Sequence, residues 1–340
     1  MQNNTKNNAR AILLQGTLFA IFILFFFWVI YKPAKTYKSN EIYRPVLSIS
    51  PQKAREFGGK PTTINVGLYI HGFPEFKIKK NHFVIDLTVW FEFDPRLITL
   101  KRISNFTFEK STILTKRQTN TKIEKSLFFV QYFMRITLKT KLEFEDFPID
   151  DHRINLSLIN KDLSPSEGIF QCSKKNITLS KNINIPGWDI INTVVETGYI
   201  ENKLKPSNTK YYPVTTFFFD FARTGIRHIL SILLPLLIIF FLSLLTFTFK
   251  SKSFRAIIFI SVGSISAILA HYFVIDRASP PSSDIMISDY LFLWALIGSS
   301  TILTINIIGE KLTQTHKNII TIALYVMLIV IMLYFFLQCC

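Results

Sequence analysis

Five long apolar runs most constrain what this chain can fold into, because each is long enough to cross a membrane as a helix. About 20 helical residues span the hydrocarbon core of a bilayer, so an uncharged run of that length is a candidate span. The runs cover residues 12–31, 229–249, 256–275, 290–309 and 319–337. The sequence therefore predicts an integral membrane protein in which the last four runs form a four-helix transmembrane domain, residues 228–340.

The first run can be an uncleaved signal anchor or a cleavable secretory signal. Its apolar core of about 20 residues exceeds the length of about 7–15 that signal peptides use. No small-residue cleavage pattern follows it, since the next residues are Lys32, Pro33, Ala34 and Lys35. We therefore expect residues 1–31 to form an extra N-terminal transmembrane helix, joined to the rest of the chain by a linker of residues 32–60.

The charges of the loops predict the orientation, because loops rich in Lys and Arg stay in the cytoplasm. Residues 250–255 and 310–318 have a basic excess, whereas residues 276–289 carry three aspartates and one arginine. This distribution places the polar region, residues 61–227, outside the cytoplasm. The expected setting is a bacterial inner membrane with the polar domain in the periplasm.

Charge and cysteine content exclude several classes of protein. The formal net charge is +16, but the basic residues are scattered or lie at the ends of the spans. That pattern fits anchoring at membrane interfaces and not a nucleic-acid partner. Cys172 is the one cysteine of the polar region, so no disulfide is expected there. Without a catalytic constellation, a phosphate loop or a metal motif, we expect neither an enzyme nor a cofactor.

The polar region alternates apolar and polar residues with a period of two, the pattern of half-buried strands. The alternating sets are Ile64, Val66, Leu68 and Ile70; Phe83, Ile85, Leu87 and Val89; Ile136, Leu138, Leu142 and Phe144; and Ile154, Leu156 and Leu158. Further runs at residues 189–197 and 214–221 and intervening turn signals complete the pattern. We therefore predict an all-β, immunoglobulin-like sandwich over residues 61–227.

Several motifs occur in an order that resembles one family. They are a Trp90-to-Leu97 strand end, the loop Phe147-Pro148-Ile149-Asp150, Gly187-Trp188, Arg223 ahead of Pro235, and the linker Arg277-Ala278-Ser279-Pro280-Pro281. Together they resemble the pentameric ligand-gated ion channels, or Cys-loop receptors, over about residues 60–337. The loop lacks its two flanking cysteines and the last loop is short, which is similar to prokaryotic members. Ile149 replaces the phenylalanine usual in the loop.

This resemblance implies a ligand-gated ion channel subunit that assembles as a homopentamer. Ligand binding in the β domain is then coupled to pore opening through a gating interface. The residues that match the family there are Phe147, Pro148, Asp150, Arg223 and Pro280. Because Asp150 and Arg223 have opposite charges, they can form a partly dehydrated ion pair or an ordinary surface salt bridge.

The third apolar run is the candidate pore helix because small and hydroxylated residues gather in it. Steps of three and four residues place Phe259, Gly263, Ser266, Ala270 and Phe273 on one face. The opposite side carries Ile257, Ile260, Ile268 and Ile275. Such a face can line water in a ring of subunits, or it can let helices pack closely. The family resemblance favours the pore.

Arg255, just before this run, and Phe259 and His271 within it bear on ion conduction. Arg255 falls at the cytoplasmic mouth of the pore, where five copies would attract anions; alternatively it extends to the membrane interface. Phe259, one turn further, can form a hydrophobic constriction. His271 can be a hydrogen-bonded packing residue or a proton sensor, and we favour packing.

The ligand is expected at the loop of residues 195–213, which matches the family's capping loop. It offers Tyr199, Tyr211 and Tyr212, whose rings can surround an amine, although tyrosines are also common in strands. Lys203, Lys205 and Lys210 suit an anionic ligand or simply keep the loop soluble. A small molecule or a proton is the expected agonist.

Two other functions compete with a channel. A non-conducting membrane sensor or scaffold with the same fold is compatible with Arg255 and Phe259 at a narrow pore end and with the additional first helix. A transporter is disfavoured because the membrane half shows no internal repeat and no pair of broken helices.

Overall fold

The computed structural model of the chain describes residues 2–31, 37, 39, 41–48, 58, 61–124, 126–205, 208–224, 227–249, 253–308 and 313–339. The chain divides into two compact units. The helical unit comprises Met1–Lys38, Glu143–Asp150 and Arg223–Cys340, and the β unit comprises Ser39–Leu142 and Asp151–Ala222. Most of the predicted linker of residues 32–60 lies outside the described residues.

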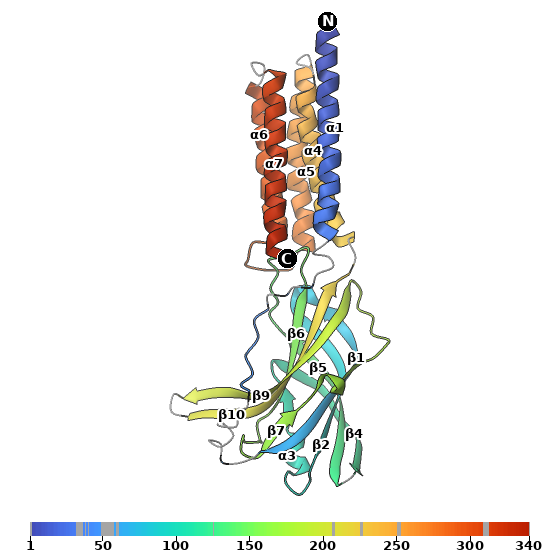
Figure 1. Cartoon of the computed structure of the whole chain (residues 1–340), viewed down its shortest axis with the longest axis vertical. Helices are drawn as coiled ribbons and strands as arrows, with labels where there is room; N and C mark the ends of the chain where they lie inside the picture. The colour runs from blue at the N-terminus through green and yellow to red at the C-terminus, as the bar shows by residue number, and fades with distance from the viewer. Residues whose placement is uncertain are drawn as a thin grey trace. The chain divides into compact units, whose positions relative to one another are not determined.

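The β unit contains two sheets (Figure 1). The first has the order β4 (Ser111–Glu124), β5 (Leu127–Lys139), β2 (His82–Phe93), β1 (Thr62–Lys77) and β7 (Gly168–Gln171), with β8 (Ile177–Leu179) also paired to β1. The second has the order β3 (Phe106–Phe108), β6 (His152–Asn160), β10 (Asn208–Arg223) and β9 (Trp188–Lys205). Short helices are η2 (Ile78–Lys80), α3 (Leu100–Ser104) and η3 (Lys174–Asn176). Strands β7 and β8 run parallel to β1, and β2 runs antiparallel to it.

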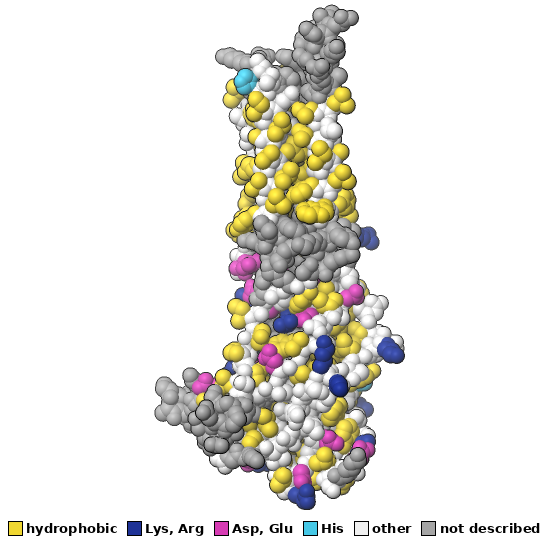
Figure 2. Space-filling model, viewed as in Figure 1, with side chains coloured by type: hydrophobic (Ala, Val, Ile, Leu, Met, Phe, Trp, Pro, Cys, Tyr) yellow, Lys and Arg dark blue, Asp and Glu magenta, His cyan; other side chains and the backbone are white. Residues whose placement is uncertain are grey.

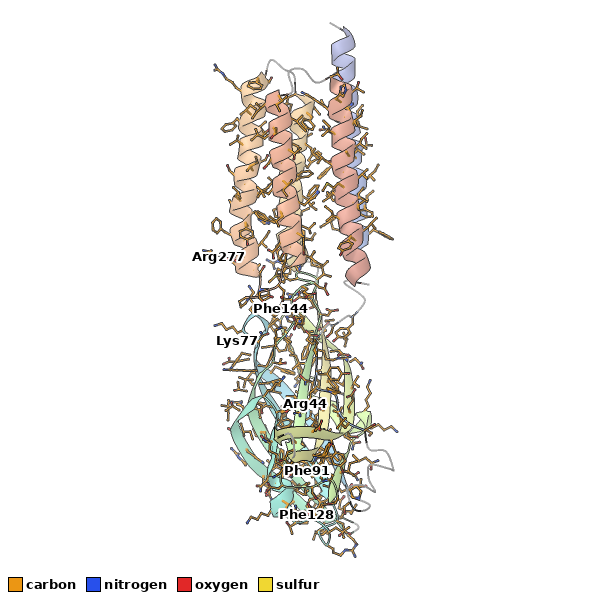
Figure 3. The ribbon with its side chains drawn as sticks, turned by 90° about the vertical axis from the view of Figure 1, so that its left-hand side faces the viewer. Arg44, Lys77, Phe91, Phe128, Phe144 and Arg277 are labelled. Carbon is orange, nitrogen blue, oxygen red and sulfur yellow. The ribbon has the colours of Figure 1, made fainter. Side chains whose placement is uncertain are left out.

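The core lies between the two sheets and contains the apolar faces that the alternation predicts. All the predicted inward residues of β1, β2, β5 and β6 are buried. Aromatic rings meet across the layers, with 4.9 Å between the centroids of Phe76 on β1 and Phe221 on β10. Phe91 of β2 (labelled in Figure 3) and Phe106 of β3 show the same separation. The prediction of a two-sheet β domain is therefore confirmed.

Gly67 of β1 is required by its cross-strand neighbour Trp90 of β2. The two residues are paired in register, and the indole ring lies across the glycine. A Cβ atom built on Gly67 would lie 2.0 Å from Cε2 of Trp90. Any side chain at position 67 would therefore displace the tryptophan from its place on the sheet.

Two details of the predicted β unit are wrong. Leu142 and Phe144 do not extend a strand, because β5 ends at Lys139 and residues 140–144 pair with no strand. Both side chains are nevertheless buried, which explains the alternation that suggested a strand. Strand β4 was not predicted, because its residues are mostly exposed and polar and therefore show no apolar period.

In its described residues the helical unit has five long helices, and they run side by side (Figure 1). They are α1 (Gln2–Tyr31), α4 (Arg227–Leu245), α5 (Phe254–Ala278), α6 (Ile287–Ile308) and α7 (Gln314–Cys339), with the single turn η4 (Thr246–Thr248) after α4. Helices α4 with η4, α5 and α6 are long and apolar enough to cross a membrane. Helices α1 and α7 contain the shorter apolar stretches Ile12–Trp28 and Thr315–Ile331. The chain is therefore a membrane protein.

The surface of the helical unit supports the same conclusion. In the view of Figure 2, hydrophobic side chains cover the helices, whereas charged side chains are spread over the β unit. Many large apolar residues of α1 and α4–α7 are exposed, among them Leu24, Leu242, Leu293, Val326 and Val330. A bilayer is the medium in which such a surface is stable.

Helix α1 packs closely against α4 and α7. The rings of Phe19 and Phe241 stack with centroids 3.8 Å apart. Phe22 lies 6.1 Å from Tyr325 of α7, and both residues are buried. The side-chain amide of Gln15 donates a hydrogen bond to the carbonyl oxygen of Leu244 at 3.1 Å. Leu244 lies in the last turn of α4, so this hydrogen bond ties α1 to the C-terminal end of that helix.

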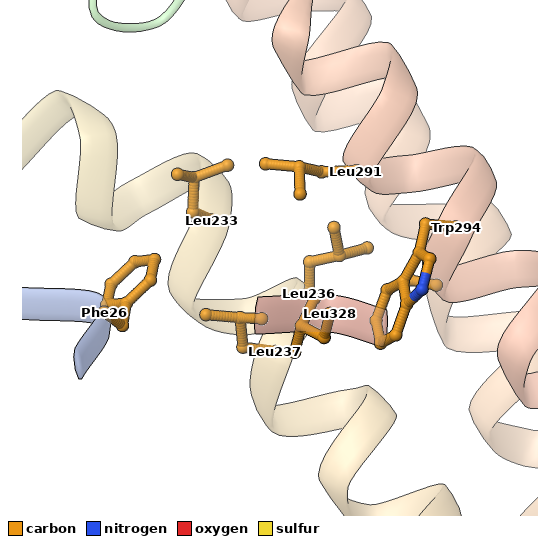
Figure 4. A pocket seen from close by; sticks show the side chains of 8 residues that line it. Phe26, Leu233, Leu236, Leu237, Leu291, Trp294 and Leu328 are labelled. Atoms are coloured by element: carbon orange, nitrogen blue, oxygen red, sulfur yellow. The ribbon is translucent and has the colours of Figure 1, made fainter. Parts of the chain in front are cut away.

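Four helices enclose a small apolar cavity at the centre of this packing (Figure 4). Its lining comes from Phe26 of α1, Leu233, Leu236 and Leu237 of α4, Leu291, Trp294 and Ala295 of α6, and Leu328 of α7. The cavity measures about 10 Å³, at the lower limit for one water molecule, and its apolar lining offers a water no hydrogen-bond partner. The first helix is thus part of the packed interior.

Candidate functional site

The predicted pore face of α5 is exposed along its whole length. Phe259 and Phe273 have exposed fractions of 80% and 70%, the largest in this helix among large hydrophobic residues. Gly263, Ser266 and Ala270 between them are exposed as well. Three of the four isoleucines predicted on the opposite side, Ile257, Ile268 and Ile275, are buried against the neighbouring helices, and Ile260 is half-buried. The described side chains thus divide α5 into an exposed face and a more buried one, with Ile260 between them.

Helix α5 is also the least covered of the three long apolar helices. Within its most apolar window 22% of the residues are buried, compared with 50% for α4 with η4 and 44% for α6. A single chain therefore leaves α5 open to its surroundings, which can be lipid, water or another copy of the chain. The small side chains between Phe259 and Phe273 leave room for water or for the close approach of a neighbouring helix.

Arg255 is exposed in the first turn of α5, one turn before Phe259. At the other end of the helix lies Arg277 (labelled in Figure 3). Both positive charges therefore lie at helix ends, where side chains can reach the membrane interface. Repeated around a ring, Arg255 would place a positive charge on each subunit at one end of the exposed face.

His271 lies on the buried side of α5 and is a packing residue, as we favoured. Its Nε2 atom lies 2.8 Å from the carbonyl oxygen of Ile232 in α4. A carbonyl only accepts, so the Nε2 atom carries the hydrogen. This contact fixes one side of the candidate pore helix to α4.

A second polar contact fixes α5 near its other end. The side-chain amide of Asn306 in α6 donates to the hydroxyl of Thr246 in η4 at 2.7 Å and to the hydroxyl of Ser261 in α5 at 3.0 Å. All three side chains are buried. The sequence analysis missed this cluster, although an asparagine inside an apolar run indicates a specific polar partner.

The loop of residues 143–150 is held to the start of the membrane helices by an ion pair. Arg223, the last residue of β10, donates from Nε to one carboxylate oxygen of Asp150 at 3.0 Å and from Nη2 to the other at 2.9 Å. The side chains have exposed fractions of 16% and 2%, so this is the partly dehydrated pair and not a surface salt bridge. Its two-point geometry fixes the orientation of both groups.

Phe147 and the start of α6 provide further contacts to this loop. The buried ring of Phe147 meets the ring of His228 edge-on at 5.4 Å, and the peptide bond before Pro148 is cis. The backbone N–H groups of Ile287 and Ser288 donate to the carbonyls of Glu145 and Phe147 at 3.1 and 3.3 Å. The first N–H groups of a helix have no partner within it, and here the loop satisfies two of them.

The predicted gating residues therefore come together only in part. Phe147, Pro148, Asp150 and Arg223 belong to one cluster at the loop. Pro280 is buried in the turn after α5, whereas the direct backbone contacts with the loop come from Ile287 and Ser288. Sequence reasoning did not identify these two residues, because backbone contacts leave no mark on residue type.

The three tyrosines proposed for ligand binding differ in position. The hydroxyl of Tyr199 donates to the carbonyl oxygens of Pro165 at 3.0 Å and Gly168 at 3.3 Å. Its ring is buried, and burial raises the pKa of Tyr199 to about 12. These contacts favour a packing role for Tyr199 over ligand contact. Tyr211 and Tyr212 are half-buried, and Lys210 is exposed; the side chains of Lys203 and Lys205 lie outside the described residues.

No metal site is found in the part of the chain that the structure describes, where no three His, Cys, Asp or Glu side chains are suitably grouped. The thiol of Cys172 is half-buried, and burial raises its pKa to about 12. A protonated thiol is a poor nucleophile and a poor metal ligand. Cys172 is therefore inert at neutral pH.

Comparison with known proteins adds no identification. No family model matches the chain, and no curated protein matches it. The likeness to pentameric ligand-gated channels therefore depends on the motifs of the sequence alone.

Proposed function

We propose that the chain is one subunit of a homopentameric ligand-gated ion channel. In this assembly α4, α5, α6 and α7 are the four transmembrane helices of each subunit, and α1 is an additional membrane helix. The α5 helices of five subunits surround the pore, and the β unit outside the cytoplasm binds a small molecule or a proton.

The exposed face of α5 is the observation that best supports this function. A membrane helix that presents Gly263, Ser266 and Ala270 outward, while its isoleucines pack inward, is suited to contact with water and ions. In a ring of five, Phe259 forms a constriction that gates by excluding water. Arg255 forms a positive ring that favours anions over cations.

Coupling between ligand and pore is assigned to the loop of residues 143–150. It contacts Arg223 ahead of α4 and the first residues of α6, so a movement of the loop is transmitted to both helices. A ligand opens the pore only if it binds the open state more tightly than the closed state. In the proposed channel the loop transmits this difference in ligand affinity from the β unit to the membrane helices.

Current through the purified protein in planar bilayers, under an asymmetric chloride gradient, tests the proposal. Wild type is compared with Phe259→Ala and Arg255→Glu during steps of pH and a panel of amines and anions. Phe254→Ala is the control, since this exposed phenylalanine lies on another side of the helix. We expect larger or constitutive currents for Phe259→Ala and a reversal potential shifted away from chloride for Arg255→Glu.

Silence of all variants in a folded, pentameric preparation would overturn the channel. The same fold would then act as a non-conducting membrane sensor or scaffold, in which Phe259 and Arg255 keep the central passage closed. Native mass spectrometry of the same preparation gives the subunit number and separates these outcomes from a failure to assemble.

A further inference from the structure

A large groove lies within the helical unit, at the end of the bundle where α6 begins. Its volume is about 900 Å³, comparable with small-molecule sites in proteins. Four segments line it: the loop of residues 143–150, the linker between α5 and α6, the first turn of α6, and the last turns of α7. All of these segments belong to the same compact unit.

One side of the groove is acidic. Glu145 and Asp146 come from the loop, and Asp284 comes from the linker. Among the lining residues that the structure describes, none is basic. The chain has a net charge of +16, yet three carboxylates line this groove. The local electrostatic potential is therefore negative and favours a cation.

The other side of the groove is apolar and continues along α7. Ile285, Ile287, Val330 and Ile331 line it, and Tyr290 and Tyr334 complete the wall. Val326, Val330 and Tyr334 are all exposed and follow one another at four-residue spacing, so they form one stripe on the helix. Tyrosines near the ends of membrane helices mark the interface between headgroups and hydrocarbon.

We propose that this groove binds a phospholipid with a primary ammonium headgroup, an ethanolamine lipid. Its ammonium carries three N–H donors that match the carboxylates of Glu145 and Asp284. Asp284 also accepts from the hydroxyls of Ser282 and Ser283 at 3.5 and 3.4 Å, which fixes its position at the groove. Its acyl chains leave the groove along the exposed stripe of α7. A soluble amine would use the acidic side alone, whereas a lipid fills the acidic and the apolar side together, which is why the lipid is the better occupant.

Binding itself does not depend on the proposed channel, but its consequence does. The carboxylates come from the loop that contacts Arg223 and from the linker that follows α5. A headgroup bound to both would hold the loop and the linker together. In the proposed channel this lipid favours whichever state brings the two segments to that spacing.

The test uses the delipidated full-length protein and four lipids with identical acyl chains: ethanolamine, its mono- and dimethyl forms, and choline. This series keeps the phosphate and removes N–H donors one at a time. Native mass spectrometry measures the lipid retained, and thermal unfolding in nanodiscs measures its stabilisation. We expect retention to fall along the series. Ethanolamine lipid should bind about tenfold more tightly than choline lipid, which is the gain in affinity that one charge-assisted hydrogen bond provides.

Two variants assign the effect to the groove. Asp284→Asn and Glu145→Gln should each abolish the preference for ethanolamine, whereas Asp276→Asn, an exposed aspartate of α5 outside the groove lining, should keep it. Equal retention of all four lipids, or an unchanged preference in both groove variants, would overturn the proposal. So would retention of a short soluble alkylamine as strong as that of the lipid, or cross-links from Val330→Cys that show a second copy covering the groove.

Discussion

The imidazole Nε2 atom of His271 lies 2.8 Å from the carbonyl oxygen of Ile232, and this contact joins α5 to α4 next to a proline. Pro235 has no N–H, so the carbonyl of Ser231, four residues earlier, loses its helical hydrogen bond. Ile232 is the next residue, in the turn that the proline weakens. A neighbouring helix thus supplies a donor at the point where α4 is least able to supply its own.

Replacing His271 with Phe should weaken the packing of α5 against α4. Hydrogen bonds between membrane helices contribute about 0.6–2 kcal/mol, and the loss should fall in this range. Thermal or denaturant unfolding in a fixed lipid environment measures it. Tyr272→Phe, on the next and exposed residue, is the control and should leave stability unchanged. An equal loss in both variants would show that the hydrogen bond has no special role.

Breaking the pair between Asp150 and Arg223 should be costly because one buried charge would remain without its partner. Removing one member of a buried pair costs about 3–5 kcal/mol, so Asp150→Asn or Arg223→Gln should destabilise the protein by this amount. The double variant should recover part of the loss, which a double-mutant cycle detects.

The control for this cycle is Arg96→Gln, which breaks the pair between Arg96 and Asp94 on the surface. Exposed pairs contribute little, so stability should hardly change. Strictly additive losses for Asp150→Asn and Arg223→Gln would contradict the coupling that their two hydrogen bonds imply.

Two serines of α5 offer a matched test of which face meets water. Ser266 is exposed and Ser264 is buried, although only one residue separates them. With the native cysteines replaced by serine, we expect a charged, membrane-impermeant thiol reagent to modify Ser266→Cys in proteoliposomes and to leave Ser264→Cys unmodified. The measurement is the mass of the labelled protein. If Ser266→Cys stays unmodified under every ligand and pH condition, its face meets lipid or protein and no pore runs along it.

The stability of the β unit should depend on pH through Lys116. Burial lowers the pKa of this lysine to about 8 from its ordinary 10.5, although its ammonium lies 3.8 Å from the ring centroid of Phe106 and donates to the carbonyl of Phe106 at 3.1 Å. A lowered pKa means that the folded state releases its proton before the unfolded state does. Stability should therefore rise as pH increases from about 8 to 10.5.

Unfolding as a function of pH, for wild type and Lys116→Met, measures this effect. The rise between pH 8 and 10.5 should disappear in the variant. Lys122→Met removes an exposed positive charge from the same strand and should retain the rise. A wild-type profile that falls with pH over this interval would contradict the assigned direction.

Two adjacent phenylalanines of α1 test whether the first helix belongs to the bundle. Phe26 is completely buried, whereas Phe27 has an exposed fraction of 41%. Phe26→Ala should lower the free energy of unfolding by about 3–5 kcal/mol, the usual cost of removing a buried phenylalanine, and Phe27→Ala should change it little. Intact mass of the purified protein, which shows that α1 is still present, accompanies both measurements. Equal behaviour of the two variants would mean that α1 does not pack as described.

Sequence periodicity predicted burial better than it predicted strand pairing. Leu142 and Phe144 are buried at alternate positions as expected, yet their backbone forms a loop whose neighbouring carbonyls accept bonds from Ile287 and Ser288. Alternation reports which side chains face a core and not where the backbone groups find partners. The same limit hid β4, whose place at the edge of a sheet requires no apolar face.

The two faces of α5 were predictable because helical geometry fixes which residues point the same way. The segments that pack against each face were not predictable, because they are distant from α5 in the sequence. Asn306 and Thr246 meet across 60 residues, and the contact of Gln15 with Leu244 crosses 229. The hydropathy pattern also underestimated the length of the helices. Helix α5 continues beyond residue 275 through Asp276 and Arg277, because charged residues end an apolar run without ending the helix.

The position of α1 has a consequence for the order in which the molecule assembles. The ribosome makes α1 before α4 and α7, the helices whose side chains cover it. Until residue 244 enters the membrane, the amide of Gln15 must face lipid, where an unsatisfied polar group is costly. The whole β unit is therefore synthesised between α1 and the helices that pack against it, so the contacts of α1 with α7 form only after α7 has been made.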